Sequence, residues 1–142
     1  MSVAKLILPN RDPVEALKAD IIATVGDVSW FRDNPTKLVV AKFIRTHIGT
    51  SGTLLAAGQT QTEDKYQGKV GLVIKLGSQC FVDGPDVQFF GFKAKLHEWV
   101  VYKSSEGIDF DYVKPGTSDH LHCKILKDSD IETVVPRPDI IW

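Results

Sequence analysis

The sequence predicts an all-β domain, built as a closed barrel or a sandwich of short strands. Near residue 37 the spacing of apolar residues changes from a helical period to a period of two. Short alternating segments then recur, separated by turn residues, through the rest of the chain. Of the 142 residues, 43% are hydrophobic and 25% are charged, which suits a single domain with its own core.

Six segments are expected to form strands: 37–46, 68–77, 87–92, 97–103, 107–113 and 121–126. In the second segment, Val70, Leu72, Ile74 and Leu76 are expected to share one face, because side chains alternate along a strand. Where both faces are apolar, this alternation does not say which face lies inside. The expected core comprises Val40, Phe43, Val70, Leu72, Ile74, Trp99, Val101, Phe110, Ile125 and Ile131.

Residues 1–35 are predicted to form an arm that contains a short helix. Asp12 is a good helix cap, Pro13 suits the first helical position, and Glu15 can complete a capping box. One narrow apolar stripe follows, made by Val14, Leu17 and Ile21 at helical spacing. A stripe of this kind must pack on something, and we expect a partner protein there.

The connection 47–67 is unusually long for a compact domain, and loops of this length are usually functional or disordered. Leu54, Leu55 and Ala56 form an apolar patch at its centre, between glycines. One interpretation is a docking element on a flexible loop. The other is a long strand pair that packs these leucines into the domain.

Several classes of function are disfavoured by composition. With 17 Lys and Arg against 18 Asp and Glu, the chain lacks the positive excess of a general nucleic-acid binder. No apolar run is long enough for a membrane helix or a signal peptide, so we expect neither membrane insertion nor secretion. Two cysteines, Cys80 and Cys123, are too few for a disulfide framework and are expected to be free thiols.

No motif for catalysis, a cofactor or a metal emerges. His120 and His122 would share a strand face, but Cys123 would point to the other, so three ligands do not converge. Asp109 and Asp111 share a face and could form a carboxylate pair, although a solvated strand face explains them better. We therefore expect a protein that is not an enzyme.

From about residue 36 to 135, the order of features resembles the GroES co-chaperonin family, especially its divergent bacteriophage members. The segment 68–77, Gly-Lys-Val-Gly-Leu-Val-Ile-Lys-Leu-Gly, is similar to the family's Gly-x-Val-x-x-Val-Gly strand. The segment 97–102 is similar to its Gly-Asp-x-Val strand, and 123–131 to its closing Asp-x-Asp-Ile segment. The resemblance implies a small GroES-like β-barrel, with the loop 47–67 in the place of the mobile loop that docks on chaperonins.

The chain also departs from that family. His97-Glu98 replaces the Gly-Asp turn, Thr53 replaces the first apolar residue of the docking triplet, and 77–95 is a phenylalanine-rich insertion. The arm 1–35 and the tail 136–142, which ends at Trp142, have no counterpart. The expected division is therefore an arm (1–35), a barrel (36–135) and a tail (136–142).

Two functions follow as expectations. The first is a capsid decoration, or cement, protein of a virion, built on the GroES-like barrel. The second is a phage co-chaperonin that caps a chaperonin ring while capsid protein folds. Both predict a homo-oligomer, located in the virion or the host cytoplasm, that binds a major capsid protein or a chaperonin ring. The residues expected to contact a partner are Leu54, Leu55, Ala56, Val14, Leu17, Ile21 and Trp142.

Overall fold

The computed structural model describes residues 12–26, 28–29, 31–44, 69–118 and 120–140. They form one α-helix, α2 (Pro13–Val25), and a six-stranded antiparallel sheet. The strands are β1 (Lys37–Lys42), β2 (Val70–Leu76), β3 (Trp99–Tyr102), β4 (Ile108–Val113), β5 (His120–Lys127) and β6 (Ile131–Val135). Short 3-10 helices follow β5 and β6, at Asp128–Asp130 and Pro138–Ile140. The described part of the chain is thus mostly β, as predicted.

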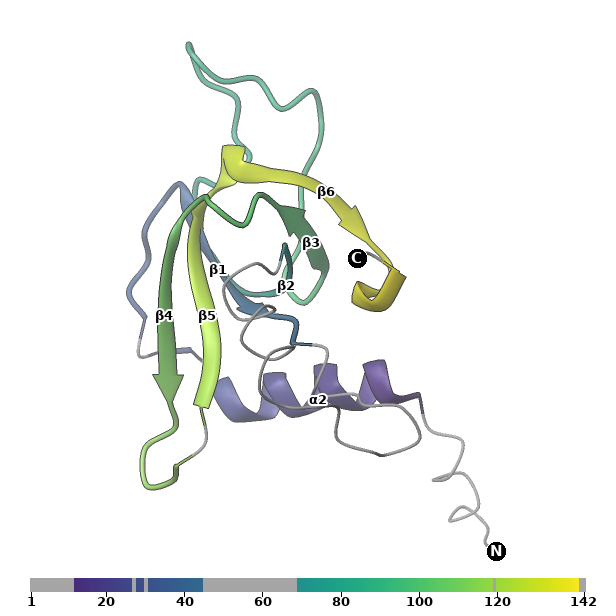
Figure 1. Cartoon of the computed structure of the whole chain (residues 1–142). Coiled ribbons are helices and arrows are strands. Elements are labelled where there is room, and N and C mark those ends of the chain that lie inside the picture. Colours follow the sequence, from purple (N-terminus) through teal and green to yellow (C-terminus); the bar gives the residue numbers. More distant parts are fainter. Residues whose placement is uncertain (1–11, 27, 30, 45–68, 119, 141–142) are drawn as a thin grey trace, which may run out of the picture.

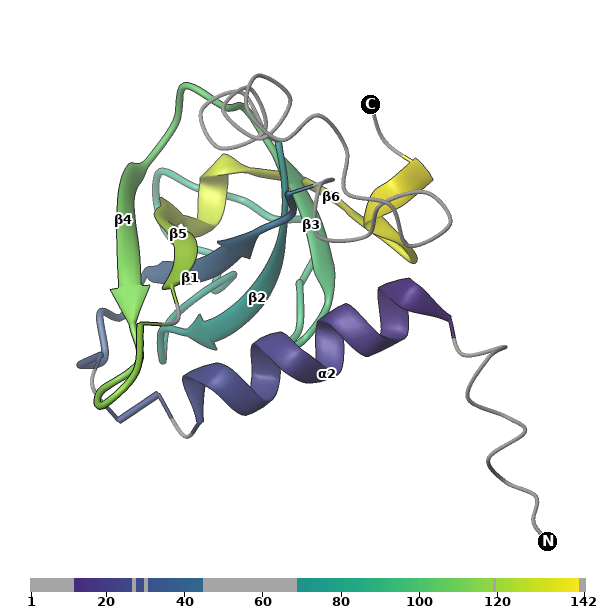
Figure 2. The ribbon, with the colours of Figure 1, turned by 60° about the horizontal axis from the view of Figure 1, so that its bottom comes forward.

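The sheet is arranged around β1. Its strand order is β4-β5-β1-β2-β3-β6, so β1 pairs with β2 on one side and with β5 on the other (Figure 1). The sheet is strongly curved, and α2 runs beneath it (Figure 2). β4 and β6 stand at the two ends of this order.

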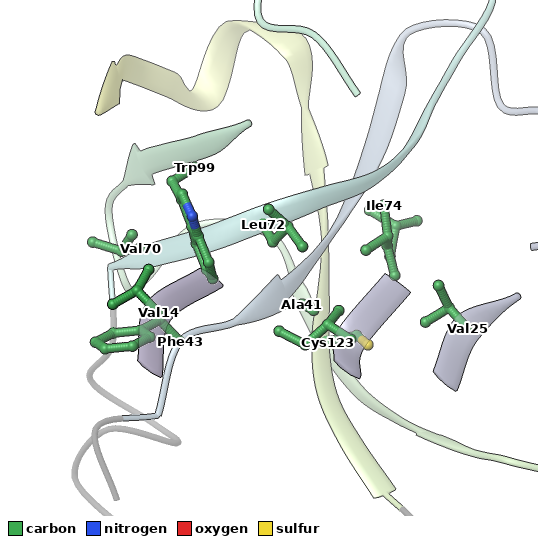
Figure 3. Packing of buried hydrophobic residues seen from close by; sticks show 11 residues of the cluster. Val14, Val25, Ala41, Phe43, Val70, Leu72, Ile74, Trp99 and Cys123 are labelled. Carbon is green, nitrogen blue, oxygen red and sulfur yellow. The ribbon is translucent and has the colours of Figure 1, made fainter. Parts of the chain in front are cut away.

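Both faces of the sheet are buried by parts of the same chain. α2 covers one face, where the helix-side cluster is formed (Figure 3). Phenylalanines of the connection 77–98, between β2 and β3, cover the other face, where the loop-side cluster is formed. The helix-side cluster consists of Val14, Ile21, Val25, Val39, Ala41, Phe43, Val70, Leu72, Ile74, Trp99 and Cys123. The loop-side cluster consists of Leu38, Val40, Val73, Cys80, Phe81, Ala94, Val100, Tyr102, Leu126 and Ile131.

The expected core is largely present, but it is divided between these two clusters. Val40 and Ile131 belong to the loop-side cluster, and the other buried members belong to the helix-side cluster. Val101, Phe110 and Ile125 are half-buried and pack against the helix-side cluster. Because β1 is buried on both faces, its apolar residues run without a break instead of alternating with polar ones.

A β-bulge in β2 changes the face of one expected core residue. Val39 pairs with Lys75 and Val40 pairs with Val73, so Ile74 is the extra residue in β2. The extra residue reverses the alternation after it. Leu76 therefore packs against the loop-side cluster, whereas Val70, Leu72 and Ile74 lie in the helix-side cluster. The prediction that all four share one face is wrong for Leu76.

One predicted strand is absent and one strand was not predicted. Residues 87–92 form no strand: Phe90 and Gly91 form a turn, with φ of +54° and +83°, and the Phe92 N–H donates to the Phe89 carbonyl at 2.9 Å. Such φ values do not fit a strand. The missing sixth strand is instead β6, which pairs with β3 along its length.

The helix α2 begins where its sequence predicts. The Asp12 carboxylate accepts the Val14 N–H at 2.9 Å, Pro13 is the first helical residue, and Gly26 ends the helix at φ +65°. Its apolar face packs on the sheet of its own chain: Val14 and Ile21 are only 1% and 2% exposed. The helix is therefore part of the core of the described structure.

The C-terminal segment is fastened to the start of this helix. The Arg137 guanidinium donates to both oxygens of Asp12, with one Nη2–Oδ1 distance of 3.2 Å, and it also donates to Asp139 at 3.0 Å. The neighbouring Pro138 is buried. Nothing in the sequence pattern of the tail predicted this contact.

Candidate functional site

The residues expected to bind a partner lie partly outside the described structure and partly within its core. Leu54, Leu55, Ala56 and Trp142 lie outside the described residues. Val14 and Ile21 are buried against the sheet of the same chain. Leu17 is half-buried and packs against the same helix-side cluster.

Asp109 and Asp111, which share a strand face, belong to two separate ion pairs. The Asp109 Oδ1 lies 2.7 Å from the Lys42 Nζ and 3.8 Å from the Lys124 Nζ, and both lysines are almost fully buried. Lys124 also donates to the Ser104 carbonyl, at 2.5 Å, and lies over the Tyr102 ring. Burial lowers the pKa of Lys124. The aspartate therefore stabilises two buried ammonium groups.

The second aspartate pairs with a histidine across β4 and β5. Asp111 Oδ1 lies 2.7 Å from His122 Nδ1, and the two residues are register partners. Cys123 faces the opposite side and lies in the helix-side cluster, as strand alternation predicts. In the part of the chain that is described, three metal-ligating groups do not gather anywhere.

Both thiols are free and buried, on opposite faces of the sheet. Burial raises the pKa of Cys123 to about 12, and burial also raises the pKa of Cys80. A thiol acts as a nucleophile only as thiolate. Neither cysteine therefore has the environment of a reactive cysteine.

Exposed apolar side chains gather on the connection 77–98, which projects from the sheet in Figure 1. Its residue Phe90 is 91% exposed and has φ +54°, which is unusual for a bulky side chain. Val82, Val87 and Leu96 are also exposed on this connection. Large exposed apolar groups held in a defined geometry are typical of protein interaction surfaces.

A groove lies beside this exposed group. It has a volume of about 450 Å³, and its apolar wall is formed by Val82, Pro85, Val87 and Phe89. Its polar wall includes Asp86 and Asp128. Asp128 is buried and accepts the Phe81 N–H at 3.0 Å, so it anchors the connection to the end of β5.

Sequence reasoning did not identify this surface, because period-two spacing made 87–92 look like a strand. The signal that could have found it is the pair of turn formers, Pro85 and Gly91, on either side of consecutive aromatic residues. The described structure contains no helix of the length and apolarity needed to cross a membrane. Comparison with protein-family models and with curated proteins gives no match for this chain.

Proposed function

We propose that this chain is a non-enzymatic assembly protein of the bacteriophage type, and most specifically a capsid decoration protein built on a GroES-like barrel. The observation that carries the proposal is Phe90, held 91% exposed in a strained turn on a projecting connection. Strained, exposed positions persist where function needs them. Both faces of the sheet are already buried by this chain. Contacts with other proteins are therefore expected at projecting segments such as the connection 77–98.

The disposition of charged groups supports a binding role over a catalytic one. Asp109 is engaged with two buried lysines, and Asp111 is engaged with His122. The Glu98 carboxylate accepts the Lys95 N–H at 2.7 Å. In these contacts the three carboxylates hold the fold together.

The alternative is a phage co-chaperonin that caps a chaperonin ring. One observation favours it: His97 has φ +67°, a conformation that glycine adopts most easily. His97 stands where the GroES-type Gly-Asp-x-Val pattern places glycine. The loop 47–67, which would dock on the chaperonin, lies outside the described residues.

The insertion 77–95 supports the capsid role over the co-chaperonin role. A co-chaperonin of the GroES type docks through its mobile loop. The aromatic insertion 77–95 has no counterpart in that family and no role in such docking. A protein that clamps neighbouring subunits of a lattice needs several contact surfaces on each copy, since weak contacts add up by multivalency.

The test uses two probes: expanded capsids assembled from the major capsid protein of the same genome, and a bacterial chaperonin ring charged with ATP. We expect the full chain to co-sediment with capsids and raise their melting temperature, and not to bind the ring. Phe90→Ser should abolish binding, while the control Ile108→Ser, at a residue 64% exposed on β4, should not. Binding to the ring alone would establish the co-chaperonin, and binding to neither would overturn both functions.

A further inference from the structure

We infer that Phe90 docks into the groove of a second copy of this chain, so that two copies exchange their aromatic tips about a two-fold axis. The inference rests on the proposed function in one respect: two copies joined through Phe90 bind the lattice with two sets of contacts, so the loss of Phe90 weakens capsid binding by breaking the pair.

The tip is rigid, because its neighbours anchor it. Phe92 N–H donates to the Phe89 carbonyl, closing a turn with Phe90 and Gly91 at its centre, both with positive φ. The rings of Phe89 and Phe92 pack edge-on against Phe81, with centroids 5.5 and 5.6 Å away. The Asp83 carboxylate also accepts the Phe89 N–H, at 2.8 Å. Phe90 is thus held away from its own core, which reduces the entropy lost when it docks.

The groove matches this tip in size and in kind. At about 450 Å³ it has room for a phenylalanine side chain, and Val82, Pro85, Val87 and Phe89 offer it an apolar wall. Phe89 belongs to both the turn and the groove, so the projection and the hollow lie next to each other. A projection beside a matching hollow is complementary to a second copy turned through 180°.

Charges favour the same arrangement. Asp86 and Asp128 line the groove together with Lys127, which leaves the groove with a net negative charge. Lys93 and Lys95, both exposed, follow Phe90 along the chain. When tips are exchanged, the lysines of one copy approach the acidic groove of the other. Opposite charges across an interface favour one docking geometry over others.

The first experiment is sedimentation equilibrium of the full chain at several concentrations. We expect a reversible dimer, weakened at least tenfold by Phe90→Ser and left unchanged by the control Ile108→Ser. Circular dichroism spectra of both variants should match that of the parent chain, because both residues are exposed. A 100-fold rise in protein concentration favours association by about 2.7 kcal/mol. A chain that is still monomeric at 100 times the concentration of the capsid assay would overturn the inference.

The second experiment tests the reciprocal geometry with charge reversals. Lys93→Glu and Asp86→Lys should each weaken self-association, because each brings like charges together twice in a symmetric pair. An equimolar mixture of the two variants should dimerise again, since each tip then meets a groove of opposite charge. The exchange of tips would be contradicted if either single variant dimerised with the affinity of the parent chain. It would also be contradicted if the mixture stayed monomeric.

The outcomes separate this inference from the proposed function. A monomer that still binds capsids would end the inference and leave the decoration role standing. A dimer that loses association in the charge reversals, yet ignores capsids and the chaperonin ring, would support the inference and end the proposed function.

Discussion

The ammonium group of Lys42 lies 2.7 Å from the carboxylate of Asp109, on the face of the sheet opposite α2. Lys42 on β1 is 4% exposed and Asp109 on β4 is half-exposed, so the ion pair joins a buried ammonium group to a carboxylate at the surface. Lys124, on the strand between them, approaches the same carboxylate oxygen at 3.8 Å. One carboxylate thus joins three adjacent strands.

Asp109→Asn is expected to destabilise the fold, because it removes the negative charge that faces two buried ammonium groups. The free energy of unfolding should fall by about 1–3 kcal/mol, measured by urea denaturation. The control Glu132→Gln, at an exposed acid on β6, should change it by less than about 0.5 kcal/mol. Equal stability of the two variants would show that other groups satisfy the lysines.

Arg137→Gln is expected to remove an acid-sensitive part of the stability. The Arg137 guanidinium lowers the pKa of Asp12 and of Asp139 below their usual value of 3.8. A carboxyl with a lowered pKa stabilises the folded state above its unfolded pKa, and this contribution is lost as the pH falls through the folded pKa. The melting temperatures of parent and variant should therefore differ at pH 7 and pH 5 and converge below pH 3.8. A difference that persists unchanged at pH 2 would contradict the ion pair.

The helix and five of the strands could be predicted because their signals are local. Asp12-Pro13 marks a helix start, and the apolar spacing of 107–113 and 121–126 marks strands. The division of the core into two faces could not be predicted, because β1 is apolar on both sides. Its second cover is a connection that contains no regular element in the described structure.

The contacts that hold the candidate surface depend on pairs distant in sequence. Asp128 accepts the Phe81 N–H, and Arg137 reaches Asp12 across almost the whole chain. No spacing in a single sequence reveals such pairs. Phe90 was missed for a different reason. The apolar spacing of residues 87–92 fits a strand, and only Gly91 in this segment signals the turn with positive φ.

Gly77→Ala is expected to disrupt the junction where β2 leads into the connection 77–98. A Cβ at this position would lie 2.0 Å from the Asn34 carbonyl oxygen and 2.5 Å from the Pro35 carbonyl oxygen. These are backbone atoms, which cannot move aside cheaply, so we expect a loss of about 1–3 kcal/mol. At Gly84 a Cβ would meet no atom within 4 Å, so Gly84→Ala should be nearly neutral in the same thermal melt.

Both thiols are expected to be unreactive in the folded protein. The raised pKa of about 12 for Cys123, and the raised pKa of Cys80, leave little thiolate at pH 8. Iodoacetamide should label neither residue within the time that it labels both in denaturant, as followed by mass spectrometry. Rapid labelling of Cys123 in the native protein would show that the helix-side cluster opens readily.

Ile21→Ala should show whether α2 is part of the core or a separable arm. Ile21 is 2% exposed and contacts the helix-side cluster, so its truncation should lower the free energy of unfolding by about 2–5 kcal/mol. Ala19, on the exposed side of the helix, provides the control: Ala19→Ser should cost less than about 1 kcal/mol. Deletion of residues 1–34 should then expose Leu72, Ile74 and Trp99 and give an aggregating chain without a cooperative melt. A soluble, cooperatively folded truncation would instead mean that the sheet is stable without its helix and that α2 is free to serve a partner.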